Sequence, residues 1–247
     1  MILGHSLGSV IAYDVVNYAW IRHYTSHLRP GRTSFKELVA VERAIADPAM
    51  AADPQDLQHQ AWLQTRRNTQ PWLVTDLVTV GSPLTYAGFL MATSRAEFRA
   101  AQLDRVLPMC PPVTSADGRF QRCTFERSYT TGDARAKPRT FVQFDHGAPF
   151  AATRWTNLYF RARWAGLSSD LVGGPVTGEF GDWVRDVELI SPIRGFSHTW
   201  CWRPATSRTH LDALHDALVM DAGRELMRLA AEMPAFQVAE RVLSSGE

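Results

Sequence analysis

The hydrophobic positions of the chain follow two periods, one typical of helices and the other typical of buried strands. Some segments repeat apolar residues at helical spacing, whereas shorter runs are rich in Val, Leu, Thr and aromatic residues. Helices and strands alternate, which predicts an α/β fold with a mostly parallel sheet flanked by helices. The predicted helices cover residues 9–28, 34–47, 53–67, 86–103 and 211–229, and the predicted strands cover 73–80, 140–144, 153–160 and 186–190.

The length of 247 residues fits a single domain, residues 1–247, in which the helices of residues 30–72 form an insertion. The insertion follows the first helix and precedes the next strand, so it is a candidate lid over a site; a packing role accounts for it at least as well. The longest uncharged stretch, residues 77–94, is interrupted by glycine and proline. It therefore predicts a strand, a turn and a helix start, and we expect no integral membrane segment.

Composition narrows the classes of partner and cofactor. The 26 basic and 25 acidic residues give a formal net charge of +1, which offers no electrostatic reason to expect nucleic acid or an anionic membrane. The cysteines, Cys110, Cys123 and Cys201, are too few for a disulfide framework, and with no signal peptide in the sequence they favour a cytoplasmic protein. His23 and His27 lie four residues apart on a predicted helix without a third ligand, so we expect no metal and no other cofactor.

The start of the chain carries the clearest chemical motif, Gly4-His5-Ser6-Leu7-Gly8. Its GxSxG spacing is typical of a nucleophile elbow, a sharp strand-to-helix turn that exposes a serine hydroxyl at the carboxyl end of a sheet. Ser6 is therefore the candidate nucleophile, and the backbone N–H of Leu7 is the candidate oxyanion donor. The glycines at both flanks are expected to leave room where strand and helix pack closely. The alternative is a glycine-rich turn with an inert serine.

A serine hydroxyl near neutral pH needs a base, and the base needs a group that orients it. His198 lies between the last predicted strand and the terminal helix, where such a base belongs; the alternative is a structural histidine packed among tryptophans. Asp170, in the loop after the strand at 153–160, is the candidate acid that accepts a hydrogen bond from the imidazole; the alternative is a turn cap. Less well placed along the chain are His146, His210, His215, Asp145, Asp182 and Asp186.

In these motifs the chain resembles the second half of an α/β-hydrolase of the lipase/esterase type. The resemblance rests on GHSLG at 4–8, VTVGSPL at 78–84, WTNLY at 155–159, DLVGGP at 170–175 and SHT at 197–199. It implies a triad of Ser6, Asp170 and His198 that hydrolyses a carboxylic ester of a small molecule or lipid through an acyl-enzyme. An acyltransferase or a thioesterase would use the same residues with a different acceptor or leaving group.

The sequence departs from this family pattern before the elbow. An α/β-hydrolase normally has several strands there, and one of their loops supplies a second oxyanion donor. The loss of one such donor costs about 100- to 1000-fold in rate. We therefore expect a truncated hydrolase or a mis-started reading frame; the alternative is a hydrolase completed by a partner chain that supplies the N-terminal half. The rival hypothesis is a non-catalytic, hydrolase-like scaffold.

Overall fold

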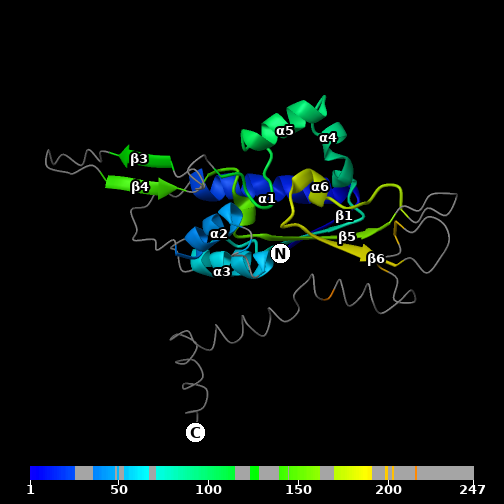
Figure 1. Cartoon of the computed structure of the whole chain (residues 1–247), viewed down its shortest axis with the longest axis horizontal. Helices are drawn as coiled ribbons and strands as arrows, with labels where there is room; N and C mark the ends of the chain where they lie inside the picture. Colours follow the sequence, from blue (N-terminus) through cyan, green and yellow to red (C-terminus); the bar gives the residue numbers. More distant parts are fainter. Residues whose placement is uncertain are drawn as a thin grey trace, which may run out of the picture.

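The computed structural model has an α/β architecture, with a four-stranded parallel sheet flanked by helices (Figure 1). This arrangement confirms the predicted fold class. The structure describes residues 1–25, 36–47, 49, 53–66, 71–114, 123–127, 139–143, 145–161, 170–190, 198–199, 202 and 215. The strands of the sheet, in spatial order, are β1 (Ile2–His5), β2 (Asp76–Val80), β5 (Arg154–Phe160) and β6 (Arg185–Leu189).

The two inner strands carry apolar residues toward both faces of the sheet. Every residue of β2 is buried, which explains its nearly continuous run of apolar residues in the sequence. On one face, the sheet contributes a compact apolar cluster of Val78, Val80, Leu158, Phe160 and Leu189. The other face lies against helices, so the sheet is the central layer that positions the ends of its strands.

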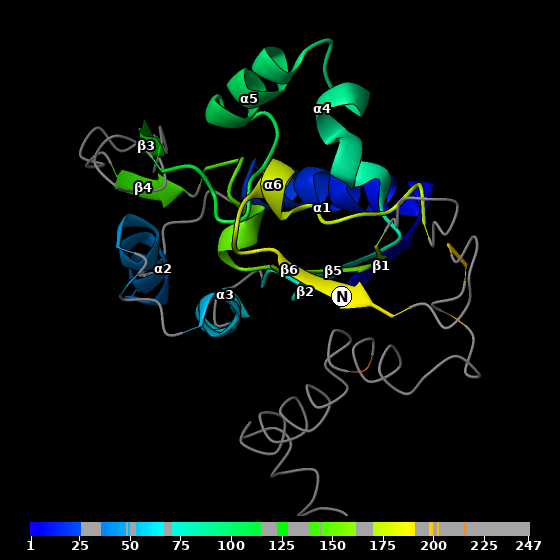
Figure 2. The same cartoon turned by 45° about the vertical axis from the view of Figure 1, so that its right-hand side comes forward.

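Helix α1 (Leu7–Thr25) follows β1 directly and runs along one face of the sheet, on the same side as α6 (Thr177–Phe180) (Figure 2). Aromatic rings fill the space between these helices and the sheet. The ring centroid of Trp155 on β5 lies 5.6 Å from that of Tyr13 on α1 and 4.9 Å from that of Phe180 on α6. All three side chains are fully buried, so this packing fixes α1, and with it the turn at its amino end, against the sheet.

The helix predicted over 86–103 is interrupted. The structure has a 3-10 turn (Pro83–Tyr86), α4 (Ala87–Leu90) and α5 (Arg95–Leu103) in this region. Ser94 has extended backbone angles, and its hydroxyl accepts a hydrogen bond from the Glu97 N–H at 3.1 Å. Serine in this conformation caps a new helix instead of continuing an old one.

Two other elements differ from the sequence prediction. The predicted strand at 140–144 is β4 (Arg139–Gln143), and it pairs antiparallel with β3 (Cys123–Arg127), for which no strand was expected. Helix α6 lies between the predicted strands at 153–160 and 186–190, where no helix was expected. The predicted terminal helix, 211–229, lies outside the described residues except for His215.

The described part of the 30–72 insertion does not cover the carboxyl end of the sheet. Its helices α2 (Lys36–Ala46) and α3 (Pro54–Arg66) pack on each other, and α3 contacts the beginning of β5. Gln58 of α3 donates to the carbonyl oxygen of Phe150 at 2.7 Å, and Gln55 donates to that of Trp155 at 3.4 Å. Figures 1 and 2 show these helices at the end of the sheet opposite the carboxyl ends of the strands. This packing favours the structural interpretation of the described helices, and the lid interpretation stays a prediction.

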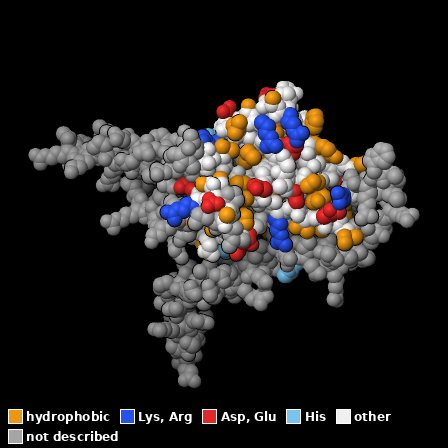
Figure 3. Space-filling model, in the orientation of Figure 1, with side chains coloured by type: hydrophobic (Ala, Val, Ile, Leu, Met, Phe, Trp, Pro, Cys, Tyr) orange, Lys and Arg blue, Asp and Glu red, His pale blue; other side chains and the backbone are white. Residues whose placement is uncertain are grey.

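The surface mixes charges of both signs. Figure 3 shows acidic and basic side chains interspersed with hydrophobic ones over the face that carries α4, α5 and α6. Within the described ranges, no helix combines the length and apolar character that crossing a membrane requires.

Candidate active site

Ser6 forms a one-residue connection between the end of β1 at His5 and the start of α1 at Leu7. Its φ angle is +53°, in the left-handed region that residues with a side chain rarely occupy. Such a conformation costs about 1–3 kcal/mol and persists only where its surroundings enforce it. The Ser6 N–H donates to the carbonyl oxygen of Val80 at 2.9 Å, which anchors the turn to the end of β2. The strained strand-to-helix turn expected from the motif is present.

Only the first glycine of the motif is required by crowding. A Cβ atom at Gly4 would lie 2.6 Å from both the carbonyl oxygen of Gly8 and the Cα atom of Ser9. A Cβ atom at Gly8 would have nothing within 4 Å. The expectation that glycine is needed at both flanks is therefore corrected: strand and helix approach closely at Gly4, whereas Gly8 faces open space.

Asp170 and His198 form a buried pair. The Nδ1 atom of His198 lies 3.1 Å and 3.0 Å from the two carboxylate oxygens of Asp170, and the exposed fractions of the two residues are 7% and 0%. The carboxylate also accepts the N–H groups of Val172 at 2.8 Å and Gly173 at 3.1 Å, which compensates for its removal from water. Because a carboxylate accepts, Nδ1 carries the proton, and the ring presents Nε2 on its opposite edge.

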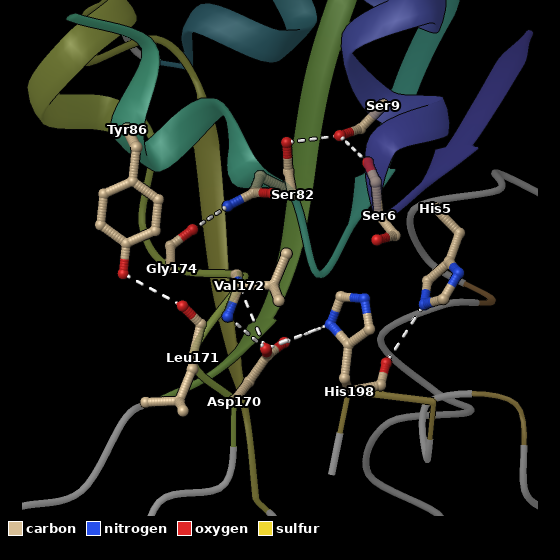
Figure 4. Close-up of polar contacts among 12 residues, drawn as sticks. His5, Ser6, Ser9, Ser82, Tyr86, Asp170, Leu171, Val172, Gly174 and His198 are labelled. Carbon is tan, nitrogen blue, oxygen red and sulfur yellow. Dashed lines mark hydrogen bonds and ion pairs between the residues drawn. The ribbon is translucent and has the colours of Figure 1, made fainter. Parts of the chain in front are cut away.

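The imidazole of His198 lies at the same edge of the sheet as Ser6. Gly81 directly follows the anchor residue Val80, and a Cβ atom there would lie 3.0 Å from His198 Cε1. Gly81 also has a φ angle of +56°, so glycine both permits the turn and leaves room for the ring. Figure 4 shows the Ser6 hydroxyl pointing toward the imidazole, with Asp170 on the far side of the ring. The structure therefore brings together the three residues that the sequence predicted as a triad.

His5, which precedes the candidate nucleophile, holds the backbone that carries His198. Its Nε2 atom lies 3.1 Å from the carbonyl oxygen of His198, and since a carbonyl only accepts, His5 donates this hydrogen bond. The two imidazole centroids are 5.0 Å apart, and the His5 ring also makes an edge contact with Trp202 at 5.6 Å. Sequence reasoning assigned His5 no role, because the variable position of the motif gives no signal for a contact 193 residues away.

Two serine hydroxyls that sequence reasoning also missed as site residues lie behind the turn. Ser9 and Ser82 are fully buried, and their oxygens are 2.6 Å apart. Ser9 also contacts the backbone of Ser6, as Figure 4 shows. Ser82 follows the Gly81 turn, so the pair connects the end of β2 to the first turn of α1.

The alternative acids have structural partners elsewhere. Asp186 accepts backbone N–H groups from Val176 and Thr177 at the start of α6. Asp145 accepts the Gly147 N–H at 2.7 Å and lies near the side chains of Arg105 and His146. The remaining alternatives that the structure describes are exposed to solvent: Asp182, His146 and His215. His210 lies outside the described residues.

The buried thiol of Cys110 and the groups that could bind a metal offer no alternative site within the described part of the chain. Burial raises the pKa of the Cys110 thiol to about 12, so it stays protonated and unreactive near neutral pH. Among the described side chains, no group of three or more His, Cys, Asp or Glu residues is arranged to hold a metal ion. His23 contacts the ring of Trp72, and its predicted companion His27 lies outside the described residues.

Comparison with known proteins found no family model, no curated protein and no solved structure that matches the chain. The functional assignment therefore depends on the geometry of the site.

Proposed function

We propose that the protein is a serine hydrolase that cleaves a carboxylic ester through an acyl-enzyme. The observation that carries the proposal is the buried Asp170–His198 pair at the sheet edge where Ser6 occupies a left-handed turn. A turn cap would not need a histidine partner, and a packing histidine would not need a carboxylate aligned with one ring nitrogen. Nucleophile, base and orienting acid are the combination that activates a hydroxyl near neutral pH.

The proposed reaction assigns one step to each residue. The Nε2 atom of His198 takes the proton from the Ser6 hydroxyl as its oxygen attacks the ester carbonyl carbon. The carbonyl oxygen becomes an oxyanion and accepts a hydrogen bond from the Leu7 N–H at the positive end of α1. The imidazolium then protonates the departing alcohol, and water releases the acid from Ser6 by the same route. Asp170 stays ionised and orients the ring.

The surroundings of the site favour an ester with an apolar portion. Several exposed hydrophobic side chains directly follow a triad residue or contact one of its neighbours along the chain. Leu7 follows the nucleophile and Leu171 follows the acid, while the Tyr86 hydroxyl donates to the Leu171 carbonyl oxygen at 3.2 Å. Trp202 contacts His5. Such side chains favour contact with the hydrocarbon part of a small-molecule or lipid ester.

The proposal extends to a partner and a compartment. Among the described residues, β1 is an edge strand of the sheet, and the side chains of Leu3 and of Met1, which precedes the strand, are exposed. A complementing chain that pairs with this edge would supply further strands and the second oxyanion donor. The buried, unpaired thiol of Cys110 favours a reducing compartment such as the cytoplasm.

Covalent labelling tests the proposal with the chain as it stands. A fluorophosphonate reacts with an activated serine, and mass spectrometry of the intact protein and its peptides locates the adduct. We expect one adduct on Ser6, its loss in Ser6→Ala, and its retention in the control Ser94→Ala, which removes a helix-capping hydroxyl in α5. A folded chain without an adduct on Ser6 would identify the protein as a non-catalytic scaffold.

A further inference from the structure

The carbonyl oxygen of Ser6 accepts two hydrogen bonds from one residue. The backbone N–H of Ser9 donates to it at 2.9 Å, and the Ser9 hydroxyl donates to it at 2.6 Å. Ser9 is fully buried, so water does not compete for its hydroxyl. This carbonyl therefore accepts a side-chain hydrogen bond in addition to the backbone hydrogen bond that the first helical turn provides.

The hydroxyl of Ser82 continues the contact away from the turn. Its oxygen lies 2.6 Å from that of Ser9 and accepts the N–H of Leu84 at 3.2 Å. A serine hydroxyl has one proton, and that of Ser9 goes to Ser6. Ser82 must therefore donate to Ser9. The hydrogen bonds then all run in one direction, from the Leu84 N–H to Ser82, from Ser82 to Ser9, and from Ser9 to the Ser6 carbonyl.

This series of hydrogen bonds ends at the Ser6 carbonyl, which belongs to the same peptide group as the candidate oxyanion donor. The Ser6 carbonyl and the Leu7 N–H belong to the same planar unit, joined by a C–N bond with partial double-bond character. A hydrogen bond to the oxygen increases that character and the positive charge on the N–H. Hydrogen bonds in a chain also polarise one another, most strongly where water is excluded.

We propose that Ser82 and Ser9 are positioning residues that orient and polarise the Ser6–Leu7 peptide, so that its N–H is a stronger donor to an anion. The catalytic consequence rests on the proposed hydrolase function. The polarisation itself is a property of the ground state and is measurable in the unreacted protein.

Nuclear magnetic resonance can observe this one peptide group directly. Ser6-Leu7 is the single Ser-Leu step in the 247-residue sequence. Labelling serine carbonyls with ¹³C and leucine nitrogens with ¹⁵N therefore leaves one cross-peak in a spectrum that correlates an amide with the preceding carbonyl. Its carbon shift reports hydrogen bonding to the Ser6 carbonyl oxygen, and its proton shift reports the polarity of the Leu7 N–H.

Variants at position 82 provide a matched pair, because Thr and Val have nearly the same shape and differ by the hydroxyl. We expect Ser82→Val to move the carbonyl carbon upfield and Ser82→Thr to keep it near the wild-type position. Ser9→Ala should move it further in the same direction, and the control Ser94→Ala should not move it. If Ser9→Ala fails to fold, the pair at position 82 decides. Equal carbon shifts for Ser82→Val and Ser82→Thr would overturn the proposal that Ser82 polarises the Ser6–Leu7 peptide through Ser9.

The rate of Ser6 phosphonylation then tests the catalytic consequence. We expect Ser82→Val to react about tenfold more slowly than Ser82→Thr, a smaller loss than the about 100-fold or more that follows removal of a whole oxyanion donor. The carbon shifts of Ser82→Val and Ser82→Thr could differ as expected while Ser6 never reacts with the phosphonate. That result would contradict the proposed hydrolase function but would support the polarisation of the Ser6–Leu7 peptide. If Ser6 reacts and the two variants at position 82 have the same shifts and rates, the role proposed for Ser82 and Ser9 is refuted while the proposed hydrolase function stands.

Discussion

The two glycines that flank Ser6 differ in the space around them, although the motif treats them alike. A methyl group at Gly4 would press on the backbone of Gly8 and Ser9, so strand and helix would have to separate. A methyl group at Gly8 would meet no atom within 4 Å, and Gly8 lies in the first turn of α1, where alanine is a better helix former.

We expect Gly4→Ala to lower the free energy of unfolding by about 1–3 kcal/mol, because overpacking against backbone forces a shift. Gly8→Ala should leave it unchanged or raise it by up to about 1 kcal/mol. Chemical denaturation of the two variants beside the wild type measures both effects. Equal destabilisation would mean that strand and helix do not approach most closely at position 4.

At the scale of single residues, the sequence predicted the candidate catalytic residues but not the residues that hold them in place. The spacing around Ser6 predicted the candidate nucleophile, and the order of elements led to the candidates Asp170 and His198. The contacts of His5 and Ser9 join positions 193 and 73 residues apart, and short-range patterns carry no information about such pairs.

Among the elements, Asp186 connects two strands of the sheet to α6. Its carboxylate accepts the side-chain amide of Asn157 on β5 at 2.6 Å and the N–H of Thr177 at 2.9 Å. Hydrogen bonds to a charged group are worth more than neutral ones, so Asp186→Ala should lower the free energy of unfolding by about 1–3 kcal/mol. Phosphonylation of Ser6 should fall less in Asp186→Ala than in Asp170→Ala. A folded Asp186→Ala protein that no longer reacts would make Asp186 the acid.

The elements themselves were predictable where local pattern and burial agree. The strand that ends just before Gly81 was visible as an apolar run, because every residue of β2 is buried. The break before α5 has a local signal in Ser94 and Glu97, which the apolar period across 86–103 obscured. The pairing of β3 with β4 depends on partners that single segments do not reveal.

For the whole molecule, the exposed apolar residues of α1 form a stripe on a helix that packs beside the edge strand β1. β1 has no strand on its outer side among the described residues, and α1 next to it exposes Leu7, Ile11, Val15 and Tyr18. Exposed apolar area beside an unpaired strand promotes association between copies of a chain.

We expect the isolated protein to self-associate as its concentration rises, and Ile11→Lys to reduce this association. The matched control is Phe89→Lys, which places the same charge on an exposed apolar residue of α4 instead of α1. Sedimentation velocity over a range of concentrations measures the effect. Equal behaviour of the two variants would show that the stripe has no special role.

The proposed function requires Ser6, His198 and Asp170 to act as one unit, and the rate constant of Ser6 phosphonylation measures this most directly. We expect His198→Ala to slow the reaction by about 1000-fold or more, Asp170→Asn to slow it less, and the double variant to be no slower than His198→Ala alone, because residues of one unit lose their effects together. A folded His198→Ala protein that reacts at the wild-type rate, or losses that multiply in the double variant, would contradict it.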